Sequence, residues 1–174
     1  MSDTMVTIIA IFLAAVLMFI LPLMSVSERG EDVSQLAVQT ATQEFVDKVA
    51  TKGVITKEDY DAYVQALGIT GNTYDIEIEV QHLDGNPGKK ATIADLIGEN
   101  LRYSEFTSTI LRFIESDTEG NKYVLSKGDN VIVSVKNTNT TLAQLLRNFV
   151  YSVTGNETYQ IGATASSLVV NNGR

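Results

Sequence analysis

The sequence contains no cysteine and no tryptophan, and its one histidine is His82. Without cysteine the chain has no disulfide, thiolate nucleophile, thiolate zinc site or iron–sulfur cluster. A single histidine also excludes a histidine metal cluster, and His82 precedes a turn at the end of a predicted strand. We expect a surface or capping role for His82, because a catalytic histidine needs a partner that orients it.

Basic residues are few as well. The chain has 13 Lys and Arg against 21 Asp and Glu, a formal net charge of −8, and its only adjacent basic pair is Lys89-Lys90. Binding to nucleic-acid phosphates requires clustered Lys and Arg that displace counterions. The sequence therefore predicts no nucleic-acid partner.

Motifs that carry catalysis are also missing. No P-loop, GxGxxG, GxSxG or HExxH occurs. Two acidic pairs could in principle bind calcium or act as acid and base, but their positions explain them otherwise. Glu58-Asp59 falls in the first turn of a predicted helix, and Glu77 with Glu79 falls on the solvent face of a predicted strand. The segment 117–121 lacks the ligand spacing of a calcium loop. We expect neither an enzyme nor a bound cofactor or metal.

Charge is nearly absent from the first 27 residues, where only Asp3 is ionisable. The stretch from Val6 to Met24 has no charged or amide side chain. As a helix it would span about 29 Å, the thickness of a bilayer's hydrocarbon core, and it has no polar face. The sequence predicts a membrane and assembly helix whose principal residues are Val6, Ile9, Leu13, Val16, Leu17, Phe19, Ile20, Leu21 and Pro22.

A cleavable signal peptide is the alternative for this segment. Ser25-Val26-Ser27 has the small-x-small pattern of a cleavage site. However, no Lys or Arg precedes the apolar stretch, which is longer than the usual apolar region of a signal peptide. Orientation has one local indicator, Arg29, which favours a cytoplasmic C-terminal domain.

The segment after Gly30 is predicted to form an amphipathic helix that ends at Gly53. Val38, Phe45, Val46 and Val49 recur at helical spacing and should pack on the domain. The two helices can join into one rod, with a kink or local melting near residues 18–22 caused by Pro22. We therefore divide the chain into residues 1–53, the helix, and 54–174, the surface domain.

The surface domain shows an α+β pattern. Apolar periodicity and capping signals predict helices, and alternation predicts strands. The expected helices are 56–68, with Gly68 as its C-cap, two that open at Thr92 and Ser104, and 141–151 with a Thr141/Gln144 capping box; the expected strands are 74–82, 123–125, 131–135 and 159–165. These elements predict a small antiparallel sheet with packed helices.

The rod and domain together resemble type IV pilins and the pilin-like proteins of bacterial tight-adherence systems (the TadE type). The likeness rests on the apolar stretch with Pro22 near its end, the amphipathic helix 33–49, and the segments ITKEDYDAYVQALGITGNTYDIEIEV and GDNVIVSVKNTNTTLAQLL. The chain lacks the processing-site Gly of such prepilins and the Glu five residues into their mature helix. Asp3 is the only acid near its start.

The resemblance implies a pilin-like fold and a structural subunit of an extracellular surface filament. It also implies an exterior domain, opposite to the indication from Arg29. The expected partners are the membrane before assembly, copies of the chain in a helical filament, and other pilus subunits. The alternative is a non-polymerising membrane-anchored surface module or a pilus assembly component.

Overall fold

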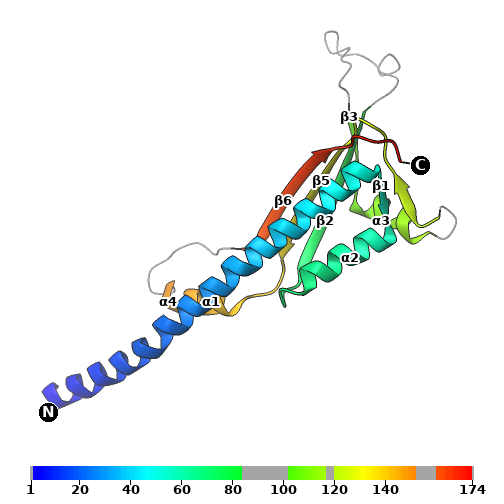
Figure 1. The fold of residues 1–174 in the computed structure, drawn as a ribbon. Helices are drawn as coiled ribbons and strands as arrows, with labels where there is room; N and C mark the ends of the chain where they lie inside the picture. The colour runs from blue at the N-terminus through cyan, green and yellow to red at the C-terminus, as the bar shows by residue number, and fades with distance from the viewer. Residues whose placement is uncertain (1, 84–101, 117–119, 152–159, 174) are drawn as a thin grey trace, which may run out of the picture.

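The computed structural model describes residues 2–83, 102–116, 120–151 and 160–173. These residues form an α+β fold, in which a long N-terminal helix is followed by small antiparallel sheets and shorter helices (Figure 1). The helices are α1 (Ser2–Lys52), α2 (Lys57–Gly68), α3 (Thr107–Glu115) and α4 (Leu142–Tyr151). The strands are β1 (Val54–Thr56), β2 (Tyr74–Leu83), β3 (Arg102–Phe106), β4 (Lys122–Val124), β5 (Asn130–Asn137) and β6 (Gly162–Leu168).

Helix α1 runs without interruption through both Pro22 and Gly30. We expected a kink or local melting near Pro22, and the helix does not melt there: a proline removes one backbone donor, and the turns on either side remain helical. The apolar and amphipathic segments are therefore one continuous rod. Its first half projects beyond the rest of the molecule, and its second half lies along the sheet (Figure 1).

The main sheet has the strand order β3-β2-β5-β6, and every neighbouring pair is antiparallel. A second sheet pairs β1 with β4. The register of β2 and β5 places Ile78 opposite Val133 and Val80 opposite Val131, and all four side chains are buried. On the opposite face of β2, Asp75 and Glu77 are exposed and Glu79 is half-buried, so the strand has the buried and solvent faces that its alternation predicts.

The second half of α1 supplies much of the core. Val38, Phe45, Val46 and Val49 are each at most 4% exposed, and they belong to one apolar cluster with the sheet. Helix α2 lies beside this half of α1 (Figure 1). Burying each such side chain contributes roughly 1.5–3 kcal/mol, so this packing fixes the direction in which α1 leaves the domain.

Local capping signals account for two of the helix starts. The Thr56 hydroxyl accepts a hydrogen bond from the Asp59 backbone N–H at 3.2 Å. At α4 the capping box is reciprocal: Thr141 accepts from the Gln144 N–H at 3.2 Å, and Gln144 accepts from the Thr141 N–H at 3.1 Å. Both helices begin where the sequence predicts.

Several elements differ from the prediction, and the strands β1 and β3 were not predicted. Gly68 is the last residue of α2, and Ile69 occupies the C-cap in a right-handed conformation. Ser104 lies in β3 opposite Gln81, and α3 begins only at Thr107, because pairing with β2 outweighs the helical pattern. The last strand begins at Gly162. The helix expected from Thr92 lies outside the described residues.

Candidate membrane and assembly helix

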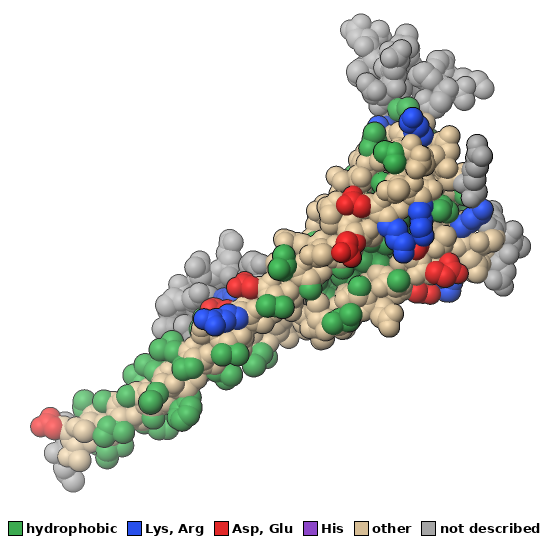
Figure 2. All heavy atoms as spheres, in the orientation of Figure 1, with side chains coloured by type: hydrophobic (Ala, Val, Ile, Leu, Met, Phe, Trp, Pro, Cys, Tyr) green, Lys and Arg blue, Asp and Glu red, His purple; other side chains and the backbone are tan. Residues whose placement is uncertain are grey.

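The first half of α1 carries a continuous apolar surface that nothing in the domain covers. Among the described residues, none of the most apolar 18-residue window is buried. Leu13 is 57% exposed and Phe19 is 77% exposed, and Figure 2 shows apolar side chains along the visible face of this part of the rod. The other predicted residues of the segment are half-buried or exposed: Val6, Ile9, Val16, Leu17, Ile20, Leu21 and Pro22.

An exposed apolar surface of this extent needs a cover in the functional state, either lipid or protein. By length and composition α1 is able to cross a membrane. A core helix of a soluble protein would be mostly buried, and this segment is not. The first half of α1 is therefore a candidate membrane anchor and the principal candidate for a functional surface of the chain.

A charged cluster marks the point where α1 leaves the domain. The Glu31 side chain is 4% exposed, and its Oε2 atom lies 3.2 Å from Arg147 Nη2 on α4. Glu31 Oε1 also accepts a hydrogen bond from the Thr141 hydroxyl at the start of α4. Glu28 lies 3.8 Å from the same arginine and is 43% exposed. These contacts attach the rod to α4 immediately after the apolar half in the sequence.

A second contact ties α1 to the sheet one turn later. The Gln35 side chain donates to the Gly162 carbonyl at 2.5 Å and accepts from the Gly162 N–H at 3.0 Å. Neither this pair nor the Glu31–Arg147 pair was predicted from the sequence. The partners are 127 and 116 residues apart, so no local pattern signals them.

His82 does not have the surface or capping role that we expected. Its side chain is 13% exposed, and its Nδ1 atom lies 2.8 Å from Oδ2 of the buried Asp129. Its Nε2 atom lies 2.5 Å from the Tyr123 hydroxyl, which in turn donates to Glu105 Oε2 at 2.9 Å. Burial, and next the hydrogen bond to Glu105, raise the pKa of Tyr123 well above its usual value.

This network has the orienting carboxylate that a catalytic histidine requires, but not the access. Both ring nitrogens of His82 are engaged, and Tyr123, which contacts Nε2, is 6% exposed. The four side chains come from β2, β3, β4 and the turn before β5. The network therefore links the two sheets, and it leaves no open position on the imidazole for a substrate.

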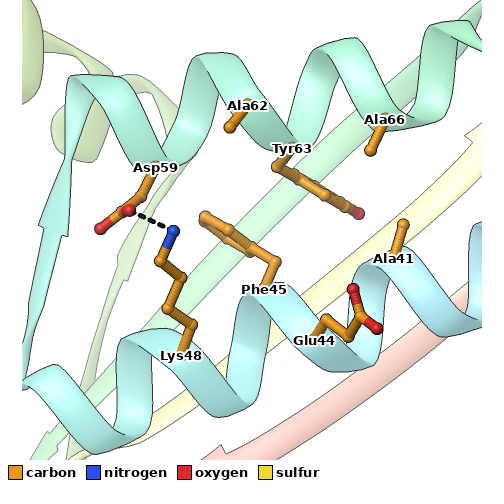
Figure 3. A pocket seen from close by; sticks show the side chains of 8 residues that line it. All are labelled: Ala41, Glu44, Phe45, Lys48, Asp59, Ala62, Tyr63 and Ala66. Atoms are coloured by element: carbon orange, nitrogen blue, oxygen red, sulfur yellow. Dashed lines mark ion pairs between the residues drawn. The ribbon is translucent and has the colours of Figure 1, made fainter.

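A small hollow lies between α1 and α2 (Figure 3). It has a volume of about 150 Å³, and its wall includes Phe45 stacked on Tyr63 at 4.5 Å between ring centroids. Burial raises the pKa of Tyr63 to about 12, although the hydrogen bond to Thr42 opposes this. Ala41, Ala62, Ala66 and this aromatic pair form the apolar part of the wall, and the charged residues that line the hollow are Glu44, Lys48 and Asp59. Within the described ranges no cluster of metal-ligating side chains is present.

Asp59 closes one end of this hollow and is held by two lysines. Its carboxylate lies 2.6 Å from Lys48 Nζ (Figure 3) and 2.9 Å from Lys52 Nζ, and both lysines are on α1. Burial by itself would raise the pKa of Asp59, but the hydrogen bonds from Lys48, Lys52 and Thr56 outweigh burial and lower it. Asp59 is thus an ionised link between α1 and α2.

Replacing Asp59 by Asn should lower the free energy of unfolding by about 1–2 kcal/mol at neutral pH, because both lysines are half-exposed and partly screened. A carboxyl group with a lowered folded-state pKa stabilises above its unfolded pKa of about 3.9, and this contribution is lost as the pH falls. The difference between wild type and variant should therefore shrink below about pH 4. Denaturant unfolding at both pH values measures it. Asp47→Asn, at an exposed position, is the control. An equal loss of unfolding free energy in both variants would contradict the role of Asp59 as an ionised link between α1 and α2.

Comparison with models of known protein families, with characterised proteins and with solved structures finds no match to this chain.

Proposed function

We propose that this protein is a structural subunit of an extracellular, pilin-like surface filament and that it polymerises through the first half of α1. The observation that supports this most directly is the continuity of α1. One unbroken helix has an exposed apolar half and a half fixed in the domain core by Val38, Phe45, Val46 and Val49. The domain is thus held in a constant direction relative to the apolar surface.

A constant direction is what a regular polymer requires. Identical subunits form a helical assembly only if each presents the same contacts in the same geometry. In the filament the apolar halves would pack with one another, so that burial at about 25 cal/mol per Å² replaces contact with lipid. The acidic domains would form the outer surface.

A membrane-anchored surface module, or an assembly component that does not polymerise, is the second candidate. The length of the apolar half favours it, because the stretch from Val6 to Met24 matches one bilayer span. Such a module needs no more than an anchor. The two candidates differ in whether the protein leaves the membrane.

Mechanical shearing of cells distinguishes these candidates. As a filament subunit, the full chain should be found largely in the sheared supernatant, where negative-stain microscopy should show filaments that antibodies to the chain decorate. An integral membrane protein of the same cells is the control and should remain with the membranes. Retention of the chain with that control, at normal expression and without filaments, would contradict polymerisation.

A further inference from the structure

Strand β6 forms one edge of the main sheet, and β3 forms the opposite edge. Within the described residues no strand pairs with the outer side of β6. An unpaired edge presents backbone N–H and C=O groups that can template another strand. Natural proteins commonly block such edges with charged residues, prolines or bulges. The seven residues of β6, GATASSL, include no charged residue and no proline.

The contacts of Gly162 show which backbone groups of β6 point outward. Both its N–H and its C=O bind the Gln35 side chain and thus face away from β5. In an antiparallel strand the outward-facing residues alternate, so the backbone groups of Thr164 and Ser166 share this direction. Both residues are exposed, and no described residue hydrogen-bonds to their backbone groups. Gln35 therefore occupies the first outward position and leaves the next two open.

A groove beside this edge has room for an extended segment. It encloses about 570 Å³ between α1 and β6. Its helix wall includes Leu36, Gln39 and Gln43, and its strand wall is formed by residues 162–165. A strand added to β6 would pair its backbone with Thr164 and Ser166 while its side chains contact α1.

We propose that the occupant of this groove is β3 of a second copy of the chain. The backbone N–H and C=O of Ile78 both hydrogen-bond to the Thr107 hydroxyl, which follows β3. The backbone groups of the even-numbered residues of β2 therefore point toward β3. Tyr103 and Glu105, which lie opposite His82 and Val80, therefore direct their backbone groups toward β2. The backbone groups of Arg102, Ser104 and Phe106 point away from β2, toward the edge of the sheet. No described residue hydrogen-bonds to these outward backbone groups of β3, so within the described part of the chain they match the outward groups of Thr164 and Ser166 on β6.

Strand direction selects this pairing. The order β3-β2-β5-β6 alternates, so a second copy in the same orientation brings its β3 antiparallel to β6. Its α1 then points the same way, as one membrane or one filament axis requires. An antiparallel pairing of two β6 strands would instead be related by a two-fold axis across the sheet, and the two α1 helices would point in opposite directions. The β3–β6 contact is also head-to-tail and does not close, so it extends the filament proposed above, on which this inference rests.

Single-cysteine variants of the full chain test the pairing, because the native chain has no cysteine. Thr164→Cys or Ser166→Cys is co-expressed with Arg102→Cys, Ser104→Cys or Phe106→Cys under a different tag, and the cells are oxidised. Facing residues in an antiparallel pair lie about 4.5–5.5 Å apart between Cα atoms, within reach of a disulfide. At least one combination should therefore give a mixed disulfide. Val64→Cys on α2, also exposed, is the control for random collision.

Three results would overturn the pairing: no mixed disulfide in any combination, a yield no higher than with Val64→Cys, or homodimers of Thr164→Cys in place of mixed dimers.

A Ser166→Pro change provides a second test. It removes an outward N–H that β5 does not use, so the fold should persist while the mixed disulfide is lost. Persistence of the disulfide in a folded Ser166→Pro chain would also overturn the pairing.

The same cells separate this inference from the proposed function. Sheared filaments without the mixed disulfide would overturn the strand pairing and leave the filament role intact. Mixed disulfides confined to the membrane fraction, with no sheared filaments, would support the pairing and contradict the filament role.

Discussion

Replacing Leu13 by Asp should abolish surface filaments while leaving the domain folded. The Leu13 side chain is 57% exposed, and the core residues of α1, Val38, Phe45, Val46 and Val49, all lie in the other half of that helix. A carboxylate at the centre of a membrane helix costs about 2.5–3.5 kcal/mol on insertion scales, and an unpaired one in a protein core is also costly. A filament repeats that cost in every subunit.

The measurement is the amount of sheared filament, normalised to the chain present in the membrane fraction. The normalisation matters because poor membrane insertion would also reduce filaments. Phe19→Asp, at a position 77% exposed, should behave in the same way, whereas Val64→Asp on α2 should leave filaments unchanged. Normal filaments from both Leu13→Asp and Phe19→Asp would rule out packing of the apolar halves.

Replacing Arg147 by Ala should destabilise the protein by about 3–5 kcal/mol, because the change leaves the buried Glu31 carboxylate without its cation. The loss should be measured as a shift in the denaturant midpoint of the full chain in detergent. Breaking this contact also weakens the attachment of α4 to the rod, which then keeps the hydrogen bond from Thr141 to Glu31. Filament yield should therefore fall with stability.

A matched pair of variants shows whether the buried charge is the cause. Glu28→Gln removes a half-exposed partner 3.8 Å from the same arginine and should cost less than about 1 kcal/mol. The double change Glu31→Gln with Arg147→Met removes both charges and should recover most of the loss. A double variant as unstable as Arg147→Ala would contradict the charge explanation.

Much of the fold could be predicted because its signals are local. The apolar stretch, the caps at Thr56 and Thr141, and the alternation in β2 and β5 each act within a few residues. Strand β3 was not predicted. A helix was expected from Ser104, but residues 104–106 pair with β2 and α3 begins at Thr107, because strand pairing outweighs the local helical pattern.

The apolar helix of the candidate site could be predicted from the sequence, but the contacts between distant residues could not. An uncharged helix long enough to span a bilayer is visible in the sequence, and so is the apolar stripe that includes Val38 and Phe45. The environment of His82 was not, because its partners Tyr123 and Asp129 are 41 and 47 residues away. A residue type and its neighbours in the chain do not indicate which distant side chains will surround it.

The sequence by itself determined that the chain begins with a membrane-length apolar helix, that it carries an acidic α+β domain, and that it lacks thiol and histidine-cluster chemistry. These properties follow from composition and short-range periodicity. Only the tertiary structure decided that α1 is one unbroken rod, that Glu31 is buried against Arg147, and that β6 is an edge strand among the described residues. Burial, ion pairing and strand order depend on contacts between segments far apart in the chain, and such contacts exist only once the backbone has folded.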